Sequence, residues 1–108
     1  MTPSQKQLNL LGLATRAKQL ISGDEFVEKA IKSKQVYLVI CACDASQATL
    51  ERYQGYCQRN QIPLFIEFNK NQISHAIGKS RTICAFANQG MAQRFLSYRI
   101  GEESMDGK

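Results

Sequence analysis

The sequence lacks any apolar run of the roughly 18 residues that a membrane-spanning helix needs. Its N-terminus also lacks a basic segment followed by an apolar core and a small-residue cleavage site. Because both features are missing, we expect a cytoplasmic protein with no membrane partner.

Histidine is scarce, since His75 is the only one in 108 residues. No second histidine or nearby carboxylate accompanies it in sequence, so an enzyme that pairs His75 with a cysteine remains only an alternative. No Gly-x-Gly-x-x-Gly motif occurs, and Gly78-Lys79-Ser80 lacks the upstream glycine of a P-loop. We therefore expect no enzymatic activity, no cofactor and no small-molecule substrate.

The cysteines form no metal-binding or disulfide pattern. Cys41, Cys43, Cys57 and Cys84 each lie within an apolar strand or helix pattern, which in a reducing compartment indicates small core residues. Cys41 and Cys43 alternate in one predicted strand, so their thiols would point to the same face. Structural zinc ligands usually come from a loop, and we therefore expect no metal site.

Solvent-facing aromatic platforms are also missing from the pattern. Tyr53, Phe65 and Phe95 are expected in the core. No exposed aromatic row like that of single-strand nucleic-acid binders is left.

Basic charge is what the chain has in excess, with 14 Lys and Arg against 9 Asp and Glu. Glu102, Glu103 and Asp106 lie near the end, opposed only by Lys108, so residues 1–100 hold 13 basic and 6 acidic side chains. The excess of basic residues over residues 1–100 favours an anionic partner, most often nucleic acid. We expect one domain over residues 1–100 and a flexible acidic tail over residues 101–108.

Hydrophobic periodicity predicts alternating helices and strands. Asp24 is placed to cap the second helix, and Asp44 or Ser46 to cap the third. The predicted helices cover residues 8–21, 24–33, 46–60, 71–77 and 91–100, and the predicted buried strands cover residues 36–42, 62–66 and 82–87. This alternation predicts the α/β class: a three-layer α/β/α sandwich, with helices on both faces of a mixed, mostly parallel sheet of about four strands.

The most distinctive segment, residues 22–32, is a glycine turn that opens a helix with mixed charges. The turn at Gly23 would leave backbone donors free for a phosphate or a base carbonyl. Glu25, Lys29 and Lys32 are spaced to share one exposed face, where a carboxylate accepts from guanine amino and imino groups and lysine donates to O6 and N7. Alternatively, the two Glu and Lys pairs spaced four apart merely stabilise the helix.

A second basic segment, Gly78-Lys79-Ser80-Arg81-Thr82, enters the last predicted strand. It could grip a phosphate or an unstacked base, or it could be a solvated turn. If folding brings the regions together, the loop would form one basic surface with Arg16, Lys18, Lys32 and Lys34.

Several motifs taken in order resemble one known family. They are Leu10-Leu11-Gly12-Leu13-Ala14, Ser22-Gly23-Asp24-Glu25 with Lys29-Ala30-Ile31, Asp44-Ala45 after the buried strand, Ile62-Pro63, and Ala76-x-Gly78. From about Leu8 to Leu96 the chain resembles the ribosomal proteins L7Ae and L30e, and most of all a small bacterial branch of that family. The resemblance implies an α/β/α sandwich that binds kink-turn RNA.

The resemblance also implies which residues bind. The start of the second helix would contact the guanine edges of tandem sheared G·A pairs through Gly23, Glu25, Phe26 and Lys29. The loop that meets a flipped-out bulge nucleotide corresponds to Lys79, Ser80, Arg81 and Thr82, and Asp44 matches a further contact position. The best-known members carry Asn then Glu where this chain has Glu25 then Phe26, and an apolar residue where it has Lys79.

We therefore predict a non-enzymatic RNA-binding protein, a ribosome-associated monomer that recognises a kink-turn or related structured RNA. The predicted RNA-binding surface comprises Arg16, Gly23, Asp24, Glu25, Phe26, Lys29, Lys32, Asp44, Lys79, Ser80, Arg81 and Thr82. Lys34 would help Arg16 and Lys32 to hold phosphates. The alternative from another class is a protein-interaction module that keeps the fold and binds a ribosomal or assembly protein.

Overall fold

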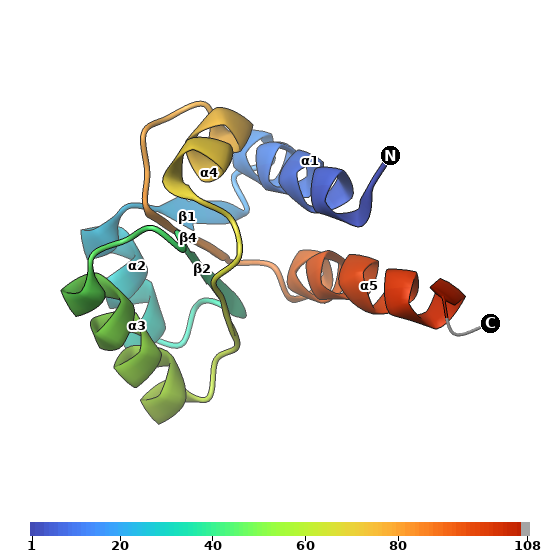
Figure 1. Cartoon of the computed structure of the whole chain (residues 1–108). Helices are drawn as coiled ribbons and strands as arrows, with labels where there is room; N and C mark the ends of the chain where they lie inside the picture. Colours follow the sequence, from blue (N-terminus) through green and yellow to red (C-terminus); the bar gives the residue numbers. More distant parts are fainter. Residues whose placement is uncertain (107–108) are drawn as a thin grey trace.

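The computed structural model describes the backbone of residues 1–106 and the side chains of residues 1–98. Helices and strands alternate along the chain (Figure 1). Their order is α1 (Pro3–Arg16), β1 (Leu20–Ser22), α2 (Asp24–Lys32), β2 (Leu38–Cys41), α3 (Gln47–Asn60), β3 (Leu64–Phe65), α4 (Lys70–Ile77), β4 (Ile83–Phe86) and α5 (Gln89–Asp106).

The four strands form one mixed sheet in the order β1-β4-β2-β3. β4 is antiparallel to both β1 and β2, and only β2 and β3 are parallel. The prediction of a mixed four-stranded sheet is confirmed, but the expectation that it is mostly parallel is wrong. The chain leaves α4 at the end of the sheet where β2 finishes, so β4 begins there and runs back alongside β2.

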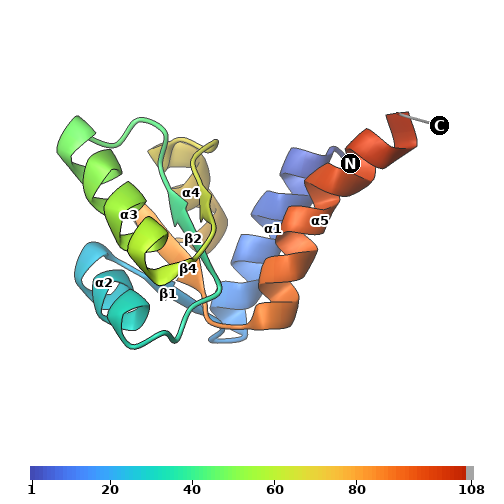
Figure 2. The same cartoon turned by 90° about the horizontal axis from the view of Figure 1, so that it is seen from below.

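Helices cover both faces of the sheet, which confirms the predicted three-layer sandwich. α2 and α3 lie on one face, and α1 and α5 lie on the other (Figure 2). Leu38 and Ile40 of β2 pack in the core beneath α1, α4 and α5, whereas Val39 and Cys41 pack beneath α2 and α3. Successive residues of a strand point to opposite faces, so a wholly apolar strand fits the centre of the sandwich.

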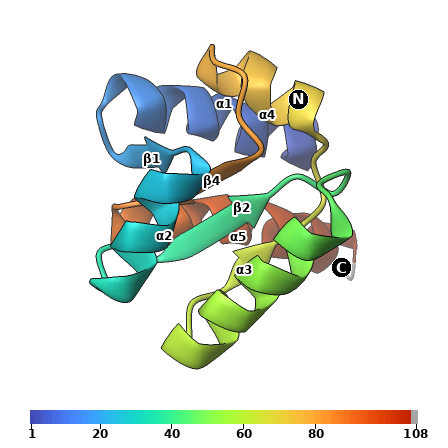
Figure 3. The same cartoon turned by 90° about the vertical axis from the view of Figure 1, so that its left-hand side faces the viewer.

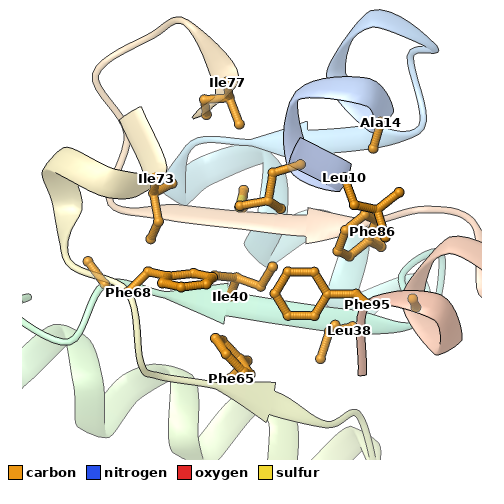
Figure 4. Close-up of a cluster of buried hydrophobic side chains, with 14 residues drawn as sticks. Leu10, Ala14, Leu38, Ile40, Phe65, Phe68, Ile73, Ile77, Phe86 and Phe95 are labelled. Carbon is orange, nitrogen blue, oxygen red and sulfur yellow. The ribbon is translucent and has the colours of Figure 1, made fainter. Parts of the chain in front are cut away.

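Phenylalanine rings fill much of the core on the α1 and α5 face (Figure 4). The ring centroid of Phe95 lies 5.0 Å from that of Phe65 and 5.4 Å from that of Phe86. Tyr53 is buried in the other layer, so the prediction that Tyr53, Phe65 and Phe95 are core residues is confirmed.

The first helix lies earlier in the chain than predicted. α1 starts after Thr2, whose hydroxyl accepts from the Gln5 N–H at 3.1 Å. It ends at Arg16, and Lys18 adopts a left-handed backbone conformation with a φ of 60°. The prediction that residues 20 and 21 are helical is wrong. They belong to the edge strand β1, because their apolar side chains suit either element and pairing with β4 decides between them.

Local capping signals set the ends of α3 and α4. Ser46 rather than Asp44 caps α3, because its Oγ accepts from the Thr49 N–H at 3.2 Å. Asn69 forms a capping box at the start of α4, and Gly78 ends that helix with a φ of 79°. The loop over residues 78–82 therefore begins at a fixed point.

The structure corrects the prediction for one cysteine. Cys41, Cys57 and Cys84 are buried as predicted, but Cys43 is exposed. β2 ends at Cys41, and the Cys43 N–H donates to the Phe68 carbonyl at 2.8 Å in the loop beyond the strand. The alternation that would place both thiols on one face does not extend that far.

The last helix continues beyond its predicted end near residue 100, to Asp106. The acidic side chains of residues 101–108 lie outside the described residues, so a flexible acidic tail stays a prediction. Within the part of the chain that the structure describes, no helix is long and apolar enough to cross a membrane.

Candidate nucleic-acid interface

The chain passes from β1 directly into α2 (Figure 3), and the residue at this junction is a glycine. Gly23 is the N-cap residue of α2, with a φ of 103° and a ψ of 141°, a conformation that strains residues with a side chain. Its N–H donates to the Ile83 carbonyl at 3.0 Å, which ties the junction to β4. The prediction that Asp24 caps the helix is wrong, because Asp24 is already the first helical residue and no side chain caps the start of α2. The backbone N–H groups and the helix dipole there favour an anion.

The loop between α4 and β4, residues 78–82, is held by Ser74 of α4. The Arg81 N–H donates to Ser74 Oγ at 2.9 Å, and the Ser74 hydroxyl donates back to the Arg81 carbonyl at 3.2 Å. Through Nη1 the Arg81 guanidinium donates to the Ser80 carbonyl at 2.8 Å. Its buried Nε has no hydrogen-bond partner among the residues that the structure describes. The loop backbone is therefore fixed, and the buried Arg81 Nε is left unsatisfied among the described residues.

The junction and the loop lie side by side at the end of the sheet where β1 and β2 finish and β4 begins. A Cβ atom on Gly23 would lie 3.7 Å from Arg81 Nε and 3.7 Å from Phe26 Cδ2. Arg81 thus lines two neighbouring hollows. The first, the Asp44 hollow, measures about 450 Å³ and is lined by the predicted residues Gly23, Asp24, Asp44, Ser80, Arg81 and Thr82. The second, the Phe26 hollow, measures about 490 Å³ and is lined by the predicted residues Phe26, Lys29, Lys79 and Arg81.

Glu25 and Lys29 form an exposed pair on the first turns of α2. Lys29 Nζ lies 3.8 Å from Glu25 Oε1, and both side chains are more than two thirds exposed. The helical pairing considered as an alternative is therefore present. A pair this exposed is weak, so the carboxylate and the ammonium can exchange each other for an external partner at little cost.

Asp24 makes internal contacts instead of standing free. Its carboxylate accepts two bonds from the Arg52 guanidinium of α3, at 3.0 and 2.8 Å. The Tyr53 hydroxyl lies within hydrogen-bond distance of the same carboxylate and 2.9 Å from the Asp24 carbonyl oxygen. The Arg52 guanidinium lowers the pKa of the Asp24 carboxyl, partial burial opposes this, and Tyr53 lowers the pKa further. The side chain that was expected to face a ligand thus fixes the start of α2 against α3.

Lys32 also turns toward α3. Lys32 Nζ donates to Glu28 Oε2 at 3.1 Å and lies 5.9 Å from the centre of the Tyr56 ring. Glu28 accepts from the Tyr56 hydroxyl as well, at 2.9 Å. Lys32 lowers the pKa of the Glu28 carboxyl, and Tyr56 lowers it further. Lys32 therefore lines neither hollow, although it shares a helix with Lys29.

Arg16 is not brought to the two hollows either. It ends α1 and lines a separate groove of about 800 Å³ between α1 and α4, together with Asn71 and His75. Lys18 and Lys34 are exposed in left-handed turns after α1 and α2 and line neither hollow.

Three polar residues that were not predicted as site residues also line the Asp44 hollow. Ser46, Thr49 and Lys70 line it beside Asp44, whose Oδ1 accepts from the Lys70 N–H at 2.9 Å. The signals that could have found them are the caps of α3 and α4, because helix starts that meet at one sheet end bring their first residues together.

The groups with catalytic potential lie elsewhere. Burial raises the pKa of Cys41 and Cys57 to about 11 and that of Cys84 to about 12, so these thiols stay protonated at neutral pH. His75 is exposed on α4 and lines neither hollow. Among the described residues, no three His, Cys, Asp or Glu side chains gather as a metal site.

The protein is an α/β/α sandwich in which a mixed sheet lies between two helical layers. At one end of the sheet, Gly23 opens α2 beside the basic loop of residues 78–82. The chain belongs to the Ribosomal protein L7Ae/L30e/S12e/Gadd45 family, whose model matches residues 5–95. The resemblance seen in the sequence motifs is thereby confirmed.

Two relatives found by sequence are bacterial proteins, in agreement with the resemblance to a small bacterial branch of the family. The chain is 33% identical to the RNA-binding protein YlxQ of Enterococcus faecium over 90 residues, which are 83% of this chain and 87% of that protein. It is also 33% identical to the RNA-binding protein YlxQ of Bacillus subtilis (strain 168) over 89 residues, 82% of this chain and 89% of that protein.

Solved structures show the same fold. A protein of unknown function from Bacillus halodurans superimposes with a TM-score of 0.83 at 37% identity, over 86% of this chain and 95% of that one. The 15.5kD RNA binding protein of Giardia lamblia superimposes with a TM-score of 0.74 at 18% identity, over 94% of this chain and 88% of that one. The second likeness concerns the fold alone.

Proposed function

We propose that this chain is a non-enzymatic RNA-binding protein that recognises a kink-turn or a related structured RNA. The observation that carries the proposal is the meeting of the uncapped start of α2 with the Arg81 loop at one end of the sheet. Family membership and the names of the YlxQ relatives support RNA as the ligand.

The start of α2 has the chemistry for guanine edges. Glu25 would accept from the amino and imino groups, and Lys29 would donate to O6 and N7. Their mutual pair is weak and exposed, so both side chains can reorient toward a base. Gly23 lets the backbone approach the RNA closely, because no Cβ atom stands at the junction.

Cations around both hollows would hold the phosphates. Lys70 and Arg81 line the Asp44 hollow, and Lys29, Lys79 and Arg81 line the Phe26 hollow. Phosphate contacts orient the RNA and account for most of the salt dependence, whereas base contacts decide which RNA is bound. Arg16 and Lys32 would contact only RNA that extends beyond the hollows.

The proposal extends to the setting of the protein. An RNA-binding monomer of this family would act on a ribosomal RNA or on a ribonucleoprotein under assembly, in the cytoplasm. No cofactor or small-molecule substrate enters this function.

Substitution of Lys29 tests the proposal. We expect Lys29→Ala to lower the affinity for a kink-turn hairpin about tenfold, because a guanine contact is lost. The loss on a plain duplex of equal length should be only about twofold, since one phosphate contact at most is removed. Gel-shift or calorimetric titration at fixed modest salt measures both affinities.

A charge-matched control separates base recognition from attraction. Lys6 of α1 lies over the Tyr98 ring at 5.8 Å, in the other helical layer, so Lys6→Ala removes one positive charge away from both hollows. It should affect the two RNAs equally and weakly. Equal losses on both RNAs for Lys29→Ala would reduce the interaction to charge attraction.

The exposed Phe26 ring specifically favours a second candidate, a protein-interaction module that uses the same helix face. The wild-type titration separates the two functions. An absence of preference for the kinked hairpin over the duplex would favour the interaction module.

A further inference from the structure

Phe26 does not belong to the hydrophobic core. Phe65, Phe68, Phe86 and Phe95 are buried, whereas Phe26 is 65% exposed on the first turn of α2. A single exposed ring needs no explanation by itself. This ring, however, forms a wall of a concave surface, the Phe26 hollow, which is distinct from the Asp44 hollow on the other side of Arg81.

The charged side chains that line the Phe26 hollow are all basic. Lys29, Lys79 and Arg81 line the hollow, and no carboxylate does. Arg81 Nε, which has no partner among the described residues, lies beside the same Gly23 position as the ring. The hollow therefore combines a flat apolar face with donors suited to an anionic group.

β1 supplies backbone hydrogen-bonding groups to the same hollow. In the part of the chain that the structure describes, β1 is an edge strand, and its one partner is β4. Gly23 donates to Ile83 and Ala87 donates to Gln19, so odd-numbered residues of this stretch face β4. The N–H and C=O groups of Leu20 and Ser22 therefore point to the open edge, and both residues line the hollow.

A flat ring, flanking cations and open backbone groups fit an unstacked nucleotide. Unpaired bases stack on aromatic side chains, use their edges for hydrogen bonds and carry a phosphate that Lys and Arg neutralise. We infer that the Phe26 hollow binds an unpaired base of the RNA, stacked on Phe26, in addition to the bulge nucleotide that the loop of residues 78–82 is predicted to meet. This inference rests on the proposed function and narrows the ligand to RNAs in which an unpaired base adjoins the guanine edges.

Three variants test the inference on a kink-turn hairpin with an unpaired bulge. Phe26→Ala should lower the affinity about tenfold, because the aromatic face on which the base stacks is lost. Phe26→Trp should bind within about threefold of wild type, because it keeps a stacking face. The chain contains no other tryptophan, so RNA binding should quench the fluorescence of that side chain alone. The matched control is Tyr37→Ala, which removes an exposed ring near the far end of the sheet and should leave the affinity unchanged.

The RNA supplies the complementary test. Unpaired nucleotides of the hairpin are replaced one at a time by abasic residues, and each hairpin is titrated with wild type and Phe26→Ala. One replacement should weaken wild type about tenfold and abolish any further effect of Phe26→Ala. Thermal unfolding of each variant checks that the fold is kept.

The outcomes separate the inference from the function on which it rests. Wild-type affinity for Phe26→Ala, together with weakened kink-turn binding by Lys29→Ala, would overturn the stacking inference and leave the proposed function standing. An equal effect of Phe26→Ala on every abasic hairpin would also overturn it. A wild-type protein that does not prefer the kinked hairpin would overturn both.

Discussion

Gly23 is the residue on which the shape of the interface depends. Its φ of 103° and ψ of 141° lie outside even the left-handed helical region that other residues occasionally adopt. We expect Gly23→Ala to lower the free energy of unfolding by about 2 kcal/mol, because the new side chain strains the backbone. Urea denaturation measures this, and the same variant should lose RNA affinity because the start of α2 moves.

Gly78→Ala is the matched comparison for that experiment. Gly78 has a φ of 79°, and a Cβ atom there would meet nothing within 4 Å. The left-handed helical conformation costs alanine about 1 kcal/mol. Gly23→Ala should therefore be the more destabilising change, and the reverse order would contradict the conformational argument.

Single residues differed in how far sequence alone could place them. Gly23 and Lys29 could be predicted, because a turn glycine and helical spacing are local signals. Asp24 could not, because Arg52 and Tyr53, 28 and 29 residues away, hold its carboxylate. The hollow beside Phe26 was equally hidden, since the helical pattern does not show that the adjoining surface is open.

At the scale of elements, contacts between α2 and α3 hold the start of α2. Asp24 and Glu28 of α2 bind Arg52, Tyr53 and Tyr56 of α3. Tyr53 and Tyr56, both on α3, pack their rings edge to face with centroids 5.5 Å apart, which fixes the two hydroxyl-bearing rings against each other. A helix start held in this way can present Glu25, Phe26 and Lys29 in one orientation.

The contacts of the Asp24 carboxylate with Arg52 and Tyr53 predict that the stability of the protein depends on pH. The folded pKa of Asp24 lies below its unfolded value, so its contribution is present at neutral pH and is lost as the pH falls through the folded pKa. Asp24 is half exposed, so the contribution is about 1 kcal/mol or less. Between pH 6 and pH 3, wild type should lose more unfolding free energy than Asp24→Asn, as measured by urea denaturation at each pH.

Glu51→Gln serves as the control for that pH series. Glu51 lies on α3 apart from the Asp24 and Arg52 contact, and among the described residues its carboxylate accepts from the Gln47 amide at 3.4 Å. Its stability should fall with acid as wild type does. Parallel curves for wild type and Asp24→Asn would show that the Arg52 contact adds nothing to stability.

Elements with strong internal signals were predictable, and elements defined by pairing were not. α3 and α4 carry capping residues and a terminal glycine, and the buried strands are compact apolar runs. β1 has three residues and gains its structure from the ladder to β4, so nothing in residues 20–22 distinguishes it from the end of a helix. Strand direction was also hidden, because a helix between two strands does not decide which end of the sheet the chain enters.

At the scale of the whole molecule, one end of the sheet brings the interface together. β1 and β2 finish there and β4 begins there, so the start of α2, Asp44 and the Arg81 loop become neighbours. The sequence predicted two basic segments and the class of fold, but their meeting depends on strand order. Arg16 shows what composition alone does not predict. It is one of the basic residues of the chain, but the fold places it in the groove between α1 and α4.

The central claim is tested most directly by titrating the wild-type protein with two RNAs over a salt series. One is a hairpin with a kink-turn, and the other has the same length and charge but Watson–Crick pairs in place of the G·A pairs and the bulge. Base contacts predict at least tenfold tighter binding to the kinked hairpin, a ratio that persists as salt weakens both affinities through the shared phosphate contacts. Equal affinities at every salt concentration would contradict the account.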